Sequence, residues 1–150
     1  MNTEKLIPHL FRTESRKISA VLNKYFGINH MEIAEDIVSD TFLSALETWP
    51  YKGIPENPKA WLYAVAKNKT KNYIFRTSNF ENNISLEIFQ NSEISTDIDL
   101  SERNISDSQL QMLFAICHPS ISKESQIGLA LKILCGFGID EIASAFLTNK

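Results

Sequence analysis

The clearest hydrophobic pattern in the chain lies between Ala34 and Trp49, where apolar residues recur with the period of an α-helix. At about 100° per residue, one broad face holds Ala34, Ile37, Val38, Phe42, Ala45, Leu46 and Trp49. The opposite side carries a single stripe with i, i+4, i+7, i+11 spacing, formed by Asp36, Asp40, Leu43 and Glu47. The pattern predicts a helix from about Met31 to Thr48, which ends because Trp49 precedes Pro50 and a residue before proline avoids helical geometry.

A second helical pattern runs from Asn57 to Arg76. Asn57 can cap its N-terminus, and Pro58 suits the first helical position. The predicted core side is Leu62, Val65, Ala66 and Tyr73. A second side carries Trp61, Asn68, Asn72 and Phe75, and a third carries Tyr63, Lys67, Thr70, Lys71 and Ile74. The helix therefore interleaves aromatic, amide and basic groups instead of presenting an ordinary charged surface.

Helices are also predicted on both sides of this pair. The first covers Leu6 to Phe26 and ends at Gly27, with Leu10, Ile18, Val21, Leu22 and Tyr25 facing inward and Arg12, Arg16 and Lys17 facing outward. Residues 77–106 show little periodicity and predict an interdomain linker, with a short helix near residues 86–90.

Residues 107–150 predict a second helical unit made of three helices. Ser106 or Asp107 can cap the first helix, which Pro119 ends, and Ser122 can cap the second. Gly136 and Gly138 close the second helix, and a third helix starts over residues 139–146. The chain is thus expected to be all-α, with a helical domain at 1–76, a linker at 77–106 and a partial second domain at 107–150.

Charge separates the two central helices. Residues 25–51 hold five carboxylates (Glu32, Glu35, Asp36, Asp40, Glu47) and no Lys or Arg, whereas residues 57–76 hold five basic residues (Lys59, Lys67, Lys69, Lys71, Arg76) and no carboxylate. Such segregation indicates two partners of opposite charge. The acidic stripe with its leucine fits a docking face for a basic protein, although an ordinary solvated face with one stray leucine explains the same pattern.

The basic helix likewise has two interpretations. Basic groups neutralise phosphates, aromatic rings stack on unpaired bases, and side-chain amides read base edges, so the helix suits a nucleic acid. Alternatively, the helix is packed on several sides, and its lysines reach past apolar neighbours to solvent.

Composition limits the remaining possibilities. The chain has 150 residues, 43% of them hydrophobic, and a net charge of −3, so a basic surface must be local and delivery to DNA by a larger partner is favoured. No apolar run suggests a membrane span or a signal peptide. Cys117 and Cys135 form no C-x-x-C pair, so we expect a reducing cytoplasm, and Cys117 is predicted to be a core cysteine before the proline that ends its helix.

Catalytic and metal-binding patterns are weak. The sequence contains no Walker loop, no G-x-G-x-x-G and no G-x-S-x-G. Cys117 and His118 are adjacent, so they point apart on a helix and lack a second ligand pair. Asp36 and Asp40 are expected on an exposed face, without a pocket to raise a pKa. We therefore expect no enzyme, no cofactor and no metal site.

The run A-E-D-I-V-S-D-T-F-L-S-A-L, followed by N-P-K-A-W-L-Y-A-V-A-K-N, resembles the promoter-binding domain of bacterial sigma factors of the extracytoplasmic-function type. The resemblance implies that Asp36, Ser39, Asp40, Leu43 and Glu47 bind a basic coiled-coil in the largest subunit of core RNA polymerase. It further implies that the melted non-template strand of the promoter minus-ten region is held by Lys59, Trp61, Lys67, Asn68, Lys71, Asn72 and Arg76. The loop at residues 51–56 would help to hold a flipped base, or is simply a turn.

The pieces DSQLQMLFAICHP, LALKILCGFG and IDEIASAFL resemble the second DNA-binding domain of a sigma subgroup with a long C-terminal extension. The sequence stops at Lys150, where that family continues into the recognition helix, so we expect a truncated form. The apolar face of Ile142, Ala145 and Phe146 would then pack on the linker or pair with a second copy. The alternative to an initiation factor is a helical protein-interaction module that retains the sigma scaffold without promoter activity, and a small helical enzyme is the least favoured interpretation.

Overall fold

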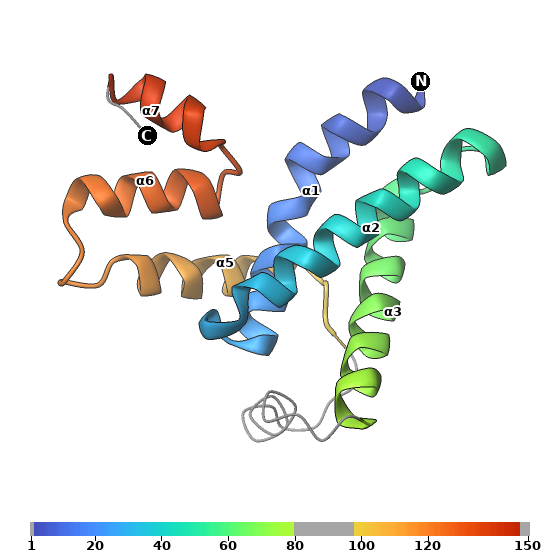
Figure 1. Cartoon of the computed structure of the whole chain (residues 1–150), viewed down its shortest axis with the longest axis horizontal. Coiled ribbons are helices and arrows are strands. Elements are labelled where there is room, and N and C mark those ends of the chain that lie inside the picture. Colours follow the sequence, from blue (N-terminus) through green and yellow to red (C-terminus); the bar gives the residue numbers. More distant parts are fainter. Residues whose placement is uncertain (1, 80–97, 148–150) are drawn as a thin grey trace.

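The computed structural model describes residues 2–79 and 98–147, and every regular element within these residues is a helix. The predicted all-α class is therefore confirmed. Three long helices, α1 (Thr3–Phe26), α2 (Met31–Lys52) and α3 (Pro58–Asn79), form the first part of the chain, and a short 3-10 turn, η1 (Ile28–His30), joins α1 to α2. Figure 1 shows α5, α6 and α7 on the other side of α1 from α3.

The core lies where α1, α2 and α3 meet. Its buried side chains include the apolar face predicted for α2 and much of the inward face predicted for α1: Ile18, Val21, Leu22, Ala34, Ile37, Val38, Phe42, Ala45, Trp49, Leu62 and Ala66. Apolar burial at roughly 25 cal/mol per Å² makes this cluster the main source of stability. Leu46 is the exception, because its side chain is 53% exposed and the prediction that it faces the core was wrong.

Local sequence signals set most helix ends. Asn2 caps α1 by accepting a hydrogen bond from the Glu4 N–H. Asn57 caps α3 through its Oδ1, which accepts from the Ala60 N–H at 3.1 Å. Gly27 ends α1 with φ of 91°, a left-handed conformation that favours glycine. These ends agree with the caps expected from the sequence for Gly27 and Asn57.

The end of α2 was predicted wrongly. The helix continues through Pro50 to Lys52, and Gly53 ends it by donating its N–H to the Trp49 carbonyl at 3.0 Å. Trp49 is almost completely buried, so its packing holds this residue in helical geometry despite the proline that follows. Pro50 lies in the last turn, where its missing N–H costs only one intrahelical hydrogen bond.

The later helices are α5 (Glu102–Ile116), α6 (Lys123–Ile133) and α7 (Ile139–Ala145). Ser101, not Ser106 or Asp107, caps α5 by accepting from the Asn104 N–H, so this helix begins inside the predicted linker. Ser122 caps α6 as expected, accepting from the Ser125 N–H. The short helix expected near residues 86–90 lies outside the described residues.

The segment before α5 joins the first core. Ile98, Leu100 and Ile105 are buried in the same cluster as the side chains of α1, α2 and α3. In contrast, α6 and α7 contain no buried residue. α6 contacts α5, and α7 contacts α6, so the last two helices are attached to the rest of the molecule mainly through α5.

Candidate functional site

The acidic stripe predicted for α2 lies on the surface. Asp36, Ser39, Asp40, Leu43 and Glu47 are all exposed. Leu43 is 49% exposed and stands among the carboxylates. Leu46 on the same helix adds a second exposed leucine, which sequence periodicity had assigned to the core. The face therefore offers both negative charge and apolar area.

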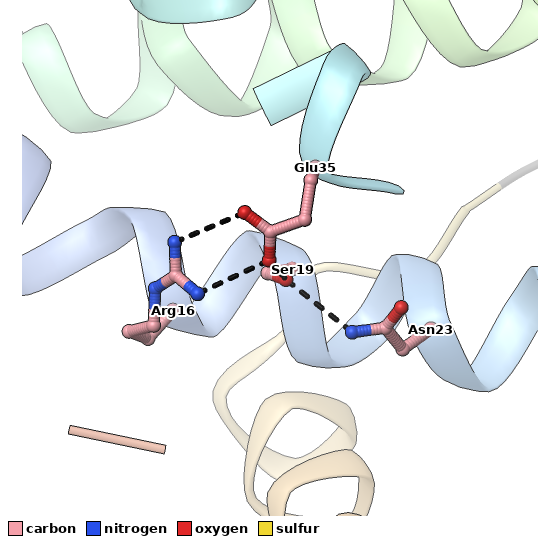
Figure 2. Close-up of polar contacts among 4 residues, drawn as sticks. All are labelled: Arg16, Ser19, Asn23 and Glu35. Carbon is pink, nitrogen blue, oxygen red and sulfur yellow. Dashed lines mark hydrogen bonds and ion pairs between the residues drawn. The ribbon is translucent and has the colours of Figure 1, made fainter. Parts of the chain in front are cut away.

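Glu35 is half-buried at the edge of the α1–α2 contact, where α1 residues hold its carboxylate. Figure 2 shows its carboxylate between Arg16 and Ser19 of α1. Arg16 donates to both carboxylate oxygens at 3.1 and 3.3 Å, and Ser19 donates to Oε1 at 3.1 Å. Asn23 in turn donates to Ser19 Oγ at 3.3 Å. Arg16, expected to face outward, is thus held against α2, and one of the five predicted acidic groups has a structural role.

A groove of about 910 Å³ lies beside the acidic stripe. Its walls come from the N-terminal half of α1, the middle of α2 and the connection between α6 and α7. The apolar lining is Ile7, Pro8, Phe11, Phe42, Leu43, Leu46 and Phe137. Ser39 and Asp40 also line it, so the predicted docking face and the groove share residues.

The predicted nucleic-acid residues on α3 fall into two groups. Asn68, Lys71, Asn72 and Arg76 are exposed, whereas Lys59, Trp61 and Lys67 are half-buried. Thr70, which the sequence placed on an outer side, is fully buried and donates to the Ala66 carbonyl at 2.8 Å. The side of α3 that carries Tyr63 and Thr70 is therefore a packed side.

Tyr63 anchors this packed side to α1. Its hydroxyl donates to Glu14 Oε2 at 2.6 Å, and Glu14 is buried and also accepts from Lys17 at 3.5 Å. Burial raises the pKa of Tyr63 well above its usual range, with further contributions from the Glu14 hydrogen bond and the nearby charges of Glu14 and Glu102. The Lys59 ammonium lies 5.6 Å from the centroid of the Tyr63 ring.

Lys67 has an acidic neighbour from the segment that precedes α5. The pKa of Asp99 is lowered, first by the hydrogen bond from the Ser101 N–H at 2.9 Å and by the Ser101 side chain, with the positive charges of Lys67 and Lys24 adding to the effect. The charge of Lys67, which the sequence assigned to DNA, therefore contributes to the lowered pKa of Asp99, although less than the hydrogen bonds from Ser101 do.

The open side of α3 carries a continuous polar stripe. Asn68, Lys71, Asn72, Phe75 and Arg76 are all exposed and follow i, i+3, i+4, i+7, i+8 spacing. Phe75 is 69% exposed, which is unusual for a phenylalanine. We define these five residues as the α3 stripe. It combines two amides, two cations and one aromatic ring on a single surface.

Trp61 contributes to the junction between α2 and α3. Its ring packs edge-to-face on Trp49, with centroids 5.2 Å apart. Trp61 is therefore half-buried, whereas the residues of the α3 stripe are in the exposed class.

The cysteines do not behave as the sequence suggested. Cys117 and Cys135 are both exposed, so the expectation that Cys117 is a core cysteine was wrong. Cys117 lies just after α5, and Cys135 lies in the wall of the groove. Among the residues that the structure describes, no group of three His, Cys, Asp or Glu side chains is placed to hold a metal ion.

Sequence reasoning missed two contributors to the groove. Phe11 is exposed beside Phe42, with the rings edge-to-face and centroids 5.0 Å apart. Leu46 was assigned inward because it continues the apolar period of α2. A helical wheel gives the direction of a side chain but not whether a neighbouring helix covers it, and Leu46 is 53% exposed.

Residues 10–80 match the sequence profile of the family described as Sigma-70 region 2. This match covers α2 and α3 and most of α1.

The chain is also similar to an uncharacterised protein of Rhizobium meliloti (strain 1021), with 30% identity over 138 residues. The match covers 86% of this chain but only 31% of that protein, so the chain spans about a third of the length of this relative. No solved structure matches the chain. Among the described helices, none combines the length and apolar character that a membrane crossing requires.

Proposed function

We propose that this protein is a transcription initiation factor of the extracytoplasmic-function sigma type that acts in the cytoplasm without catalysing a reaction. In this proposal it binds core RNA polymerase through α2 and holds the melted non-template strand of the promoter through α3. The observation that carries the proposal is that α2 exposes an acidic face and α3 exposes the α3 stripe, which contains two cations. These two surfaces suit partners of opposite charge.

The docking face consists of Asp36, Ser39, Asp40, Leu43 and Glu47. Exposed carboxylates around an apolar side chain suit a basic helix pair, because charge guides the encounter and the leucine supplies buried area after docking. The partner in this proposal is the basic coiled-coil of the largest polymerase subunit.

Among the residues predicted to contact DNA, we favour those whose side chains are exposed. The α3 stripe is open and contains Asn68, Lys71, Asn72 and Arg76, to which Phe75 adds a ring that can stack on an unpaired base. Lys59, Trp61 and Lys67 remain part of the proposal as half-buried groups at the edge of this surface.

A pull-down with bacterial core RNA polymerase tests the first half of the proposal. Wild-type protein should bind core, and Asp40→Lys should lose binding while its helical circular dichroism is retained, because Asp40 is exposed. Ser44 donates to the Asp40 carbonyl and not to its carboxylate, so the substitution removes no side-chain hydrogen bond found there. Unchanged affinity of Asp40→Lys would contradict the docking face.

A bubble-shaped promoter probe tests the second half. In the presence of core, the protein should bind the probe more tightly than a fully paired duplex of the same sequence. The second candidate function is a protein-interaction module without promoter activity. Core binding without any preference for the bubble would support that candidate instead.

A further inference from the structure

We infer that the connection between α6 and α7 (residues 134–138) is an autoinhibitory latch. In the observed state it rests on α1, and it must leave α1 before core RNA polymerase can cover the docking face on α2. This inference rests on the proposed function, because it concerns access to that face. It goes further in giving the C-terminal helices a regulatory role.

The latch contacts α1 at Arg16. Gly136 has φ of 75°, and a β-carbon at this position would lie 3.2 Å from Arg16 Cγ and 3.5 Å from its Cδ. Any side chain at residue 136 would therefore press on the stem of Arg16, whereas glycine lets the backbone approach. Figure 1 shows the connection at the edge of the C-terminal helices that faces α1.

Arg16 is restrained on its other side. Its guanidinium donates to both carboxylate oxygens of Glu35, at 3.1 and 3.3 Å (Figure 2). Its Nε lies 3.7 Å from the same β-carbon position at Gly136, and this buried atom has no acceptor among the described residues. A buried donor without an acceptor raises the free energy of the closed state. The contact thus fits closely but is held weakly, a combination that suits a reversible latch.

The connection is built to move together with α6. The Phe137 N–H donates to the Leu131 carbonyl at 3.1 Å, which ties the connection to the last turn of this helix. Neither α6 nor α7 contains a buried residue, and α6 joins the rest of the molecule mainly through α5. Lifting the connection from α1 therefore exposes little apolar surface. The hinge for this motion would be the turn between α5 and α6, at residues 117–122.

The latch lies opposite the docking face across the groove. Gly136 and Phe137 line this groove together with Asp40 and Leu43 of the docking face. An α-helix about 10 Å wide fills roughly 400 Å³ per turn. The groove volume of about 910 Å³ therefore accommodates about two turns of a single helix. The helix pair of the proposed function is wider, so it cannot cover the docking face while the connection stays on α1.

Gly136→Asn tests the latch directly. Asparagine tolerates a positive φ better than most residues, so the variant acts mainly through its β-carbon, which would push the connection away from Arg16. Because closed molecules do not bind, opening the latch raises the apparent affinity for bacterial core RNA polymerase, and we expect binding at least about threefold tighter than wild type. Unchanged or weaker binding would contradict the latch.

Gly138→Asn is the matched control within the same connection. A β-carbon at Gly138 would meet a Glu141 carboxylate oxygen at 3.6 Å, which is an ordinary contact with a flexible group. This variant should bind core as wild type does. Tighter binding by both glycine variants would show that the effect does not come from the contact with Arg16, and it would overturn the inference.

Phe137→Ser opens the latch by a different route. The phenylalanine lines the groove, so its loss removes apolar contact from the closed state without adding bulk. Core binding should again tighten, whereas Ile139→Ser should bind as wild type does, since Ile139 is 54% exposed and lies outside the groove lining. Weaker binding by Phe137→Ser would indicate that Phe137 contacts the polymerase and would contradict the latch.

Thiol reactivity tests the closed state without polymerase. Cys135 lines the groove beside Gly136, whereas Cys117 lies outside the lining. In a Cys117→Ser protein, a bulky maleimide should alkylate Cys135 at least about twofold faster once Gly136→Asn is added, because reactivity follows exposure. In a Cys135→Ser protein, the rate at Cys117 should not change. Equal Cys135 rates with and without Gly136→Asn would show that the connection is not held on α1.

Asp36 separates this inference from the proposed function, because it belongs to the docking face but does not line the groove. If Asp36→Lys loses core binding while Gly136→Asn and Phe137→Ser bind as wild type does, the docking face stands and the latch is wrong. If neither wild type nor Gly136→Asn binds core, both are wrong. Binding by Gly136→Asn alone would support both.

Discussion

Tyr63 and Glu14 show how one hydrogen bond joins two helices of this molecule. Glu14 is buried on α1, where a carboxylate without partners would be costly, and it accepts from Tyr63 of α3 and from Lys17. Removing the tyrosine hydroxyl leaves this buried acceptor with one partner fewer. The pair therefore stabilises the position of α3 relative to α1.

We expect Tyr63→Phe to lower the free energy of unfolding by about 1–3 kcal/mol, the range for losing a hydrogen bond to a buried charged group. Urea denaturation followed by circular dichroism measures this change. Tyr51→Phe is the control, because Tyr51 is exposed and its substitution should stay within about 0.5 kcal/mol of wild type. Equal midpoints for the two variants would contradict a structural role for Tyr63.

The same tyrosine predicts how stability depends on pH. Burial and Glu14 raise the folded-state pKa of Tyr63 above its ordinary value of 10.0, so the unfolded chain loses this proton first as the pH rises. The contribution of Tyr63 to the free energy of unfolding is therefore complete below pH 10. It is lost as the pH rises from 10 through the higher folded-state pKa. When denaturation is measured across the alkaline range, the free energy of unfolding of Tyr63→Phe should fall less steeply with pH than that of wild type. The remaining slope should come from Tyr73, whose pKa is also raised by burial.

Phe75 carries the prediction for nucleic-acid binding. We expect Phe75→Ala to weaken binding of the bubble probe in the presence of core by about tenfold, because stacking of one base on an aromatic ring contributes about 1–3 kcal/mol. Phe114→Ala is the matched control, since Phe114 on α5 is 72% exposed. Both variants should bind core normally. Equal probe binding by both variants would remove Phe75 from the site.

At the scale of elements, the sequence predicted the helices better than their ends and outer faces. Periodicity located α1, α2 and α3, because burial of one face is what stabilises each of them. It could not predict that α2 continues past Pro50, since that depends on the tertiary packing of Trp49. It also could not show that Leu46 is exposed or that Thr70 is buried, because neighbouring helices decide which part of a wheel is covered.

Two glycines allow the helix ends to be tested. Gly53 ends α2 with φ of 88°, whereas Gly128 lies within α6, and a β-carbon would meet no atom within 4 Å at either position. Gly53→Ala should destabilise the protein by about 1 kcal/mol, because the positive φ at this position is unfavourable for alanine even though no neighbouring atom would clash with its β-carbon. Gly128→Ala should stabilise α6 by about 0.5–1 kcal/mol through higher helix propensity. Thermal unfolding of the two variants should therefore shift in opposite directions.

At the scale of the whole molecule, stability is unevenly distributed. The core joins α1, α2, α3 and the segment that begins at Ile98, and α5 is attached to it through Ile105. By contrast, α6 and α7 contain no buried side chain and present exposed apolar residues such as Ile127 and Ile139. The surface area that these helices bury is therefore a small part of the total.

Hydrogen exchange should reveal this difference. Amides of α6 and α7 should exchange at least about tenfold faster than those of α1 and α2, since their opening exposes little apolar surface. The amides of α5 should be intermediate, because one side of this helix is buried at Ile105, Met112 and Ile116. Uniform protection across the described helices would show that the molecule opens only as a single unit.

The contact between Trp49 and Trp61 has a consequence for spectroscopy. The chain has two tryptophans, and both lie at the junction of α2 and α3 with their rings 5.2 Å apart. Intrinsic fluorescence therefore reports on that junction alone and is insensitive to melting of α6 and α7. Ellipticity, which sums over all helices, should begin to fall before the indole emission changes during a gradual denaturation. The separation between the fall in ellipticity and the change in indole emission would measure how much the C-terminal helices unfold before the three-helix core does.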